Sequence, residues 1–199
     1  MLAVKVVEVS TLSLAGSEKT KDEIMRKLGK ECDLLRKLKK NSNIVKYYGF
    51  LEDKEKEQAS IFMEYIPCGT LQSMYKDFGP IDELMVKRFA KQILNALVYV
   101  HQNNIIHGDV KAANILFDGN EIKLSDFGES MGDCFASCDP GLSNSNIFSE
   151  EINGSIKWMA PEVFLQRPRG RRSDIWSLGC TLIELLTAAN PWPKVKEIG

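Results

Sequence analysis

Two short stretches, HGDVKAAN at positions 107–114 and DFG at positions 126–128, carry the strongest chemical signal in the chain. They share polar side chains suited to a metal–phosphate group, namely Asp109, Lys111, Asn114 and Asp126. Carboxylate and amide oxygens bind hard divalent cations, and a lysine beside them can neutralise phosphate charge. This combination is typical of phosphoryl transfer, in which catalysis consists mostly of positioning and charge neutralisation.

Helix and strand patterns flank both stretches. Apolar residues recur at helical spacing over 82–102, ahead of HGDVKAAN. Short strands are expected at 115–117 and 121–124, on either side of an Asp-Gly-Asn hairpin signal. A helix that is apolar nearly all round is predicted over 174–188, which predicts burial. Residues 131–153 have no periodicity, so we expect a long loop there.

The beginning of the chain has a different pattern, richer in strands. The strands are expected over 2–9, 44–51 and 59–65. A capping box at Thr20–Glu23 begins a helix that is expected to run to about Lys40. Pro67, Cys68 and Gly69 then break the pattern. We therefore divide the chain into a β-rich part, residues 1–66, and a helical part, residues 67–199, which together predict a two-lobed α+β fold.

Two charged residues stand within apolar patterns. Lys5 lies inside the valine-rich first strand, and Glu31 lies between Leu28 and Leu35 on the helix stripe that should face the core. Burial of either charge alone is costly, whereas in a pair each offsets the desolvation of the other. The residues by themselves leave two possibilities: an ion pair between Lys5 and Glu31, or exposure of both side chains to solvent.

With these charges included, the sequence resembles the eukaryotic protein kinase family from residue 3 to about residue 193. The matching segments are Ala3-Val4-Lys5, 107–114, 126–128, Ala160-Pro161-Glu162 and 174–179 (DIWSLG). Any one of them is a weak match, but all occur in the family's order at plausible spacing. The resemblance implies a protein-kinase-like fold with a small β-rich N-lobe and a helical C-lobe.

The resemblance implies a role for each matching polar residue. Lys5 would hold the α- and β-phosphates of ATP and pair with Glu31. Asp109 would accept or orient the proton of the substrate hydroxyl, and Lys111 would stabilise the γ-phosphoryl group. Asp174 would anchor the backbone of the catalytic loop. The Mg²⁺ ligands would be Asn114 and Asp126.

The resemblance also implies where adenine and the protein substrate bind. The adenine-binding residues would be Ala3, Met63, Glu64, Ile66 and Leu116. Of these, Met63 would be the gatekeeper, the backbone of 64–66 would read the base, and Ala3 and Leu116 would sandwich it. Ser155 would belong to the substrate loop and contact Asp109 and Lys111.

Finer details resemble one subfamily, the MAP kinase kinase kinases. The segments concerned are 44–49 (IVKYYG), 62–65 (FMEY), 158–162 (WMAPE) and 174–181 (DIWSLGCT). A lysine at position 111 is typical of Ser/Thr kinases. The resemblance therefore implies phosphorylation of a protein on Ser or Thr, with a MAP kinase kinase as the expected substrate.

The sequence departs from the family pattern at both ends. No Gly-x-Gly-x-x-Gly precedes Lys5, so the glycine-loop hairpin is missing and we expect weak ATP binding. The sequence stops just past Pro191-Trp192-Pro193, before the family's last helices, which should expose apolar surface of the 174–188 helix. Both departures together favour a fragment or an incomplete gene model, and we expect this chain by itself to be inactive rather than active.

Composition excludes several function classes. A length of 199 residues corresponds to about one domain, and a formal net charge of −1 argues against nucleic-acid binding. No apolar run reaches the ~18 residues of a membrane span. The five cysteines are odd in number and irregular in spacing, which indicates reduced thiols and a cytoplasmic location.

Two other function classes stay open beside a Ser/Thr kinase. The missing glycine loop and Gly108 favour a pseudokinase or scaffold, which would bind nucleotide with Mg²⁺ but transfer no phosphate. A small-molecule kinase on a related fold is disfavoured because 154–155 and 160–162 resemble a loop shaped for protein segments. The intact set of polar residues favours the kinase that acts on proteins.

Gly108 replaces the arginine that precedes the catalytic aspartate in the resembled family, where it meets a phosphate on the activation loop. Phosphates in that loop would have less to bind here. We expect phosphorylation at Ser143, Ser145, Ser149 or Ser155 to matter less here, so a longer, active form of the protein should retain most of its activity when Ser143, Ser145 and Ser149, which have no other assigned role, are changed to alanine. A substrate-phosphorylation assay measures this, and abolished activity would contradict the expectation.

Overall fold

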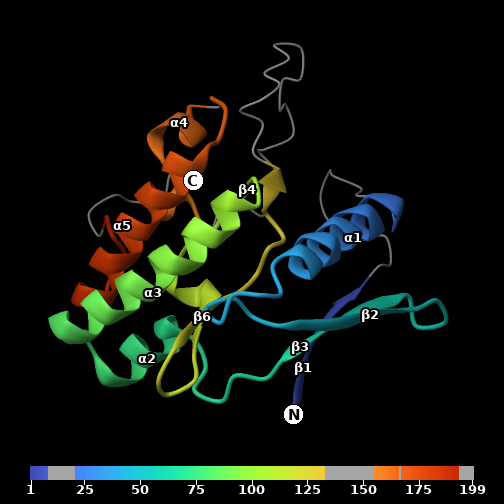
Figure 1. Cartoon of the computed structure of the whole chain (residues 1–199), viewed down its shortest axis with the longest axis horizontal. Helices are drawn as coiled ribbons and strands as arrows, with labels where there is room; N and C mark the ends of the chain where they lie inside the picture. The colour runs from blue at the N-terminus through green and yellow to red at the C-terminus, as the bar shows by residue number, and fades with distance from the viewer. Residues whose placement is uncertain (9–20, 133–154, 166, 193–199) are drawn as a thin grey trace.

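The computed structural model describes residues 1–8, 21–132, 155–165 and 167–192. A small antiparallel sheet and one helix form one part, and a group of helices forms the other (Figure 1). This is the α+β arrangement of two lobes expected from the sequence. Within the described residues, no helix has both the length and the apolar character needed to cross a membrane.

The sheet has the strand order β1-β3-β2. Its strands are β1 (Leu2–Glu8), β2 (Tyr47–Asp53) and β3 (Gln58–Glu64). Along β1 exposure alternates, so that Leu2, Val4 and Val6 are exposed, whereas Lys5 shares the more buried face. Helix α1 (Lys21–Lys37) lies over the sheet (Figure 1) and buries Glu31. The two-residue period of the strand therefore turns Lys5 away from the exposed valines.

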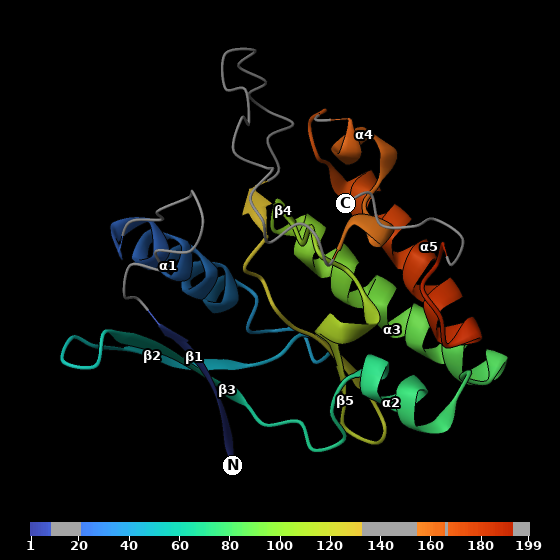
Figure 2. The same cartoon turned by 180° about the vertical axis from the view of Figure 1, so that it is seen from behind.

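The helical part is built around α3 (Glu83–Gln102) and α5 (Arg171–Thr187), which lie side by side in both views (Figures 1 and 2). The smaller elements are α2 (Leu71–Phe78), α4 (Pro161–Phe164) and the 3₁₀ turns Ala112–Asn114 and Ile156–Trp158. Two short antiparallel pairs complete it, β4 (Ile105–Ile106) with β7 (Met131–Gly132) and β5 (Ile115–Phe117) with β6 (Ile122–Leu124). The stretch HGDVKAAN thus runs between β4 and β5.

The predicted strand over 44–51 was wrong at its start, because β2 begins only at Tyr47. The preceding residues follow β6 instead: the Val45 amide donates to the Leu124 carbonyl (3.0 Å), and the Leu124 amide donates to the Asn43 carbonyl (2.8 Å). The apolar run over 44–51 therefore contacts both parts of the molecule and connects them.

Other boundaries also differ from the sequence expectation. Helix α1 ends at Lys37 rather than about Lys40, and α5 begins at Arg171 rather than at 174. Helix α2 was not predicted, although the Thr70 hydroxyl and Ser73 form a capping box at its start. Residues 131–132 form β7 rather than loop. Thr20 and the remainder of the predicted loop, 133–153, lie outside the described residues.

Helix α5 is not buried all round, contrary to the prediction. Its buried face is largely polar, with Ser173, Asp174, Ser177, Thr181 and Glu184 all less than a tenth exposed. On the other face, within the part of the chain that the structure describes, the exposed apolar residues are Ile175, Trp176, Ile183 and Leu186. The buried polar groups make hydrogen bonds to neighbouring elements, which compensates for their desolvation.

Gln92 on α3 illustrates how one side chain holds the β5–β6 hairpin. Its Oε1 accepts from the Ile122 amide (2.7 Å) and from Asn43 Nδ2 (3.3 Å). We predict that Gln92→Leu lowers the free energy of unfolding by about 1–3 kcal/mol, because the buried Ile122 amide loses its acceptor. Gln92→Glu, which keeps an acceptor oxygen, should cost less. Urea denaturation measures both, and equal effects would contradict this account.

Candidate active site

Asp174 holds the start of HGDVKAAN in place. Its carboxylate accepts from the backbone amides of His107 (3.0 Å) and Gly108 (2.8 Å), and it lies 2.7 Å from Nε2 of His101. The side chain is only 1% exposed. Burial by itself raises the pKa of Asp174, but the His101 contact, the nearby His107 and the two amides outweigh burial and leave the pKa below its ordinary value. The carboxylate is therefore charged and fully bonded.

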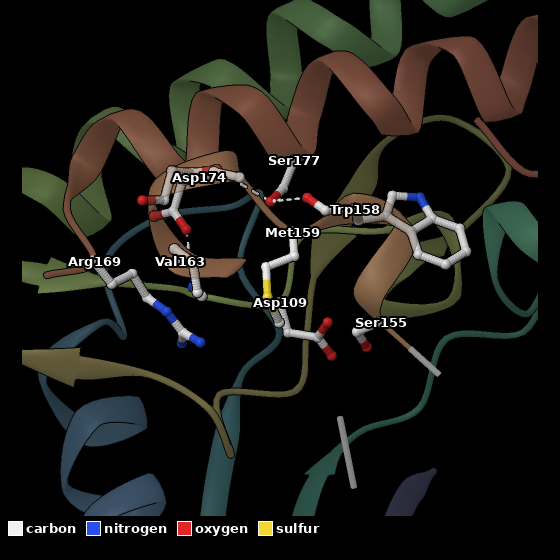
Figure 3. Close-up of a pocket in the computed structure, with 11 residues that line it drawn as sticks. Asp109, Ser155, Trp158, Met159, Val163, Arg169, Asp174 and Ser177 are labelled. Atoms are coloured by element: carbon white, nitrogen blue, oxygen red, sulfur yellow. Dashed lines mark hydrogen bonds between the residues drawn. The ribbon is translucent and has the colours of Figure 1, made fainter. Parts of the chain in front are cut away.

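The polar residues of HGDVKAAN converge on one carboxylate. Asp109 Oδ2 lies 2.7 Å from Lys111 Nζ and accepts from Asn114 Nδ2, also at 2.7 Å. Lys111 Nζ in turn lies 2.6 Å from Ser155 Oγ. Asp109 and Ser155 line the same pocket, with the carboxylate and the hydroxyl on the same side of it (Figure 3). Four residues expected to act together are thus in direct contact.

Lys5 links the sheet to α1 and to the DFG stretch. Its Nζ lies 3.0 Å from Glu31 Oε1 and 3.0 Å from Asp126 Oδ1. Glu31 is 4% exposed, whereas Lys5 and Asp126 are 35% and 45% exposed. Of the two possibilities left open by the sequence, the pair is confirmed for Lys5 and Glu31. The third partner, Asp126, makes this an ion-pair triad.

The triad shifts two pKa values in opposite directions. Burial lowers the pKa of Lys5, but Asp126 and Glu31 outweigh it, so the pKa lies above its ordinary value. Burial raises the pKa of Asp126, but Lys5 and the Gly128 amide outweigh it, so this pKa lies below its ordinary value. Lys5 and Asp126 therefore both favour their charged forms at neutral pH.

Asn114 and Asp126, the expected metal ligands, are brought together through Ser125. The Ser125 amide and hydroxyl both donate to the Asn114 carbonyl, at 2.9 Å each. Asn114 uses its amide nitrogen on Asp109, and Asp126 uses Oδ1 on Lys5, so among the residues that the structure describes one side-chain oxygen of each is left for a cation. Mg²⁺ is usually held by one or two protein oxygens together with phosphates and water. This donor set fits Mg²⁺.

The residues expected around adenine lie along the junction of the two parts. Ala3 pairs with Met63 across β1 and β3. Met63 and Leu116 both pack against the same hydrophobic core, although Leu116 belongs to β5. Ile66 is buried.

Glu64 joins the two parts through its side chain. Its carboxylate accepts from the Lys46 amide (2.7 Å) and lies 3.4 Å from Lys123 Nζ on β6. Lys123 is largely buried and also donates to the Ser42 carbonyl (2.8 Å). The side chain of Glu64 is therefore committed to these contacts, and its backbone amide donates to the Lys46 carbonyl (2.9 Å).

Glu184 is a buried residue of this site whose place the sequence analysis did not identify. Its carboxylate accepts from Tyr75 Oη (2.9 Å), Trp158 Nε1 (2.8 Å) and the Ala112 amide (3.2 Å). It therefore joins α2, HGDVKAAN and the turn that follows Ser155. The available signal was a single acid interrupting an apolar helix pattern.

Comparisons with known proteins agree with this geometry. A family model described as the protein kinase domain matches residues 1–199. The chain is 40% identical to a mitogen-activated protein kinase kinase kinase of Pyricularia oryzae and 40% identical to mitogen-activated protein kinase kinase kinase A of Dictyostelium discoideum, over 100% of its length in each case. It is 37% identical to the serine/threonine-protein kinase STE11 of Saccharomyces cerevisiae over 98% of its length.

The chain belongs to the protein kinase family. It spans only 21%, 20% and 26% of the length of these three relatives, respectively.

Glu184 provides a test of how the site is supported. We predict that Glu184→Leu lowers the free energy of unfolding by about 3 kcal/mol or more, because three buried donors lose their acceptor. Glu184→Gln should cost much less: its oxygen can accept from Trp158 and Ala112, while its NH₂ can donate to Tyr75 Oη. Urea denaturation of both variants at neutral pH measures the difference, and equal losses would contradict this account.

The stability of the unmodified chain relative to the Glu184→Gln variant should depend on pH. Burial raises the pKa of Glu184 above its ordinary value of 4.5. The folded state therefore binds a proton more tightly than the unfolded state, and stability falls as pH rises from 4.5 through the raised pKa. Relative to Glu184→Gln, the unmodified chain should lose stability over this interval, and a constant difference would contradict the raised pKa.

Proposed function

We propose that the chain carries the catalytic site of a protein serine/threonine kinase, which transfers the γ-phosphate of ATP to a Ser or Thr hydroxyl of a protein. The observation that supports this most directly is the contact of Asp109 with both Lys111 and Asn114, with Ser155 on Lys111. A carboxylate, a cation and a metal-ligating amide in one cluster match the needs of phosphoryl transfer.

Each residue of the cluster has a task in this proposal. Asp109 accepts the proton of the substrate hydroxyl, and the amide of Asn114 keeps the carboxylate in one orientation. The ammonium of Lys111 neutralises charge on the transferring phosphoryl group, and Ser155 holds that ammonium near the substrate. Lys5 binds the α- and β-phosphates and is held by Glu31.

The donor oxygens of Asn114 and Asp126 would hold Mg²⁺, which, when bound, neutralises charge on the phosphates. Before nucleotide binds, Asp126 Oδ1 is paired with Lys5. Binding of phosphates and metal would give both residues new partners of opposite charge, so the pair can separate without leaving either charge uncompensated.

The remaining parts of the proposal concern adenine, the lobes and the partner. Adenine would bind at the boundary between an N-lobe, residues 1–66, and a C-lobe, residues 67–199, against Ala3, Met63 and Leu116 and the backbone of 64–66. The protein substrate would be a MAP kinase kinase, which is supported by the names of the relatives. A cytoplasmic location is supported by the thiols of Cys32, Cys68 and Cys180, which are free within the part of the chain that the structure describes.

We predict that a longer, active form of the protein transfers labelled phosphate from ATP to Ser or Thr of a MAP kinase kinase. Asp109→Asn should lower kcat by about 10² or more and leave KM for ATP within about twofold, because general-base help is lost but nucleotide contacts are kept. Lys91→Ala, an exposed change on α3, is the control.

Two results would contradict the proposal. If Asp109→Asn is as active as the unmodified chain, Asp109 is not the base. If a fluorescent ATP analogue binds with Mg²⁺ but no phosphate is transferred, the chain acts as a binding module.

A further inference from the structure

Gly108 has a backbone conformation and surroundings that exclude a side chain. Its φ is +82°, in the region that favours glycine. A Cβ atom built there would clash with Arg169 Nη1 and lie only 2.9 Å from the Glu129 carbonyl oxygen. Because the Gly108 amide is bonded to Asp174, this part of the backbone cannot easily shift to make room. The space beside Gly108 belongs to the guanidinium of Arg169.

Arg169 uses that space to reach the segment after the DFG stretch. It comes from the residues that precede α5, and its Nη1 donates to the Glu129 carbonyl (3.2 Å). Glu129 follows Gly128 directly, and its own carboxylate lies 2.8 Å from Lys27 on α1. A chain of contacts therefore runs from the segment before α5, through Glu129, to the helix that carries Glu31.

The guanidinium also lies beside the catalytic cluster. Arg169 lines the same pocket as Asp109 and Ser155, and in Figure 3 its head group extends toward the middle of that pocket. The side chain is half-buried. The segment that carries it is held at the Gly170 amide, which donates to Ser173 Oγ (3.2 Å), and Ser173 Oγ donates to Glu162 (2.7 Å). Arg169 thus projects from a braced segment.

We propose that Arg169 is a positioning residue for phosphoryl transfer, and that Gly108 is its partner because it leaves the space the guanidinium needs. Arg169 acts through Glu129: it holds the backbone that follows Asp126 at a set position relative to Asp109. This inference rests on the proposed function, because both aspartates act on one substrate complex there.

A rigid, planar donor suits this role. The guanidinium offers several N–H groups in fixed directions, whereas a lysine ammonium is a point charge on a flexible stem. Lysine at position 169 should therefore reach the Glu129 carbonyl with less precision. Small displacements of reacting groups are expensive in rate, so the effect should appear in kcat more than in nucleotide binding.

The first experiment is a double-mutant cycle on phosphate transfer. Arg169→Ala and Gly108→Ala should each lower kcat about tenfold, with KM for ATP within about twofold, and Arg169→Lys should restore part of the loss. The double variant should be no worse than Gly108→Ala alone, because a Cβ at position 108 already displaces the guanidinium. Arg167→Ala, an exposed change in the same segment, is the matched control and should stay at the unmodified rate.

This cycle separates displacement of Arg169 from backbone strain. If Gly108→Ala lowers kcat only because position 108 has a positive φ, its effect is independent of Arg169. The two losses in kcat then multiply in the double variant. Multiplying losses, or an Arg169→Ala variant with unchanged kcat, would overturn the proposal.

A second measurement does not depend on activity. Amide hydrogen exchange in residues 127–132 should become faster in Arg169→Ala and in Gly108→Ala, and should be unchanged in Arg167→Ala. Unchanged exchange in the first two variants would overturn the inference. If the longer form without these substitutions transfers no phosphate, the proposed function fails, whereas the exchange data still decide whether Arg169 positions this segment.

Discussion

The buried carboxylate of Asp174 is the contact on which the arrangement of the site depends. It accepts two consecutive backbone amides, from His107 and Gly108, and thereby sets the direction in which HGDVKAAN leaves β4. Asp109, Lys111 and Asn114 can meet one another only because that backbone is held. A buried carboxylate with three donors around it is stable as an anion, and for the same reason it cannot be removed without leaving buried donors unpaired.

Helix α5 is the framework from which several such contacts originate. Its buried face carries Ser173, Asp174, Ser177, Thr181 and Glu184 together with the apolar Leu178, Cys180 and Leu185, whereas a core helix usually has an apolar stripe alone. Asp174 holds HGDVKAAN from one end, and Glu184 holds it at Ala112 while also binding Trp158. Hydrogen bonds have direction and apolar contacts do not, so this helix can fix the orientation of loops that carry the proposed catalytic residues.

Polar contacts join the two parts of the molecule in addition to the hydrophobic core that they share. Lys5 reaches Asp126, and Glu64 reaches Lys123, in each case from the sheet to the helical part. The backbone bonds between Asn43, Val45 and Leu124 add a third connection. Partly exposed ion pairs can exchange partners when charged ligands arrive, which suits a junction where nucleotide phosphates are proposed to bind.

Much of the fold and site was determined by the sequence alone, since the helix over 82–102, the β5–β6 hairpin and the set Asp109, Lys111, Asn114 and Asp126 depend on local periodicity, turn residues and spacing. Only the tertiary structure decided where β2 begins, because Ile44 and Val45 were free to follow either sheet. It also decided the contacts of Glu184 and Arg169. Their partners lie far away in the chain, and a single charged residue in a sequence does not indicate which distant donor or acceptor will balance it.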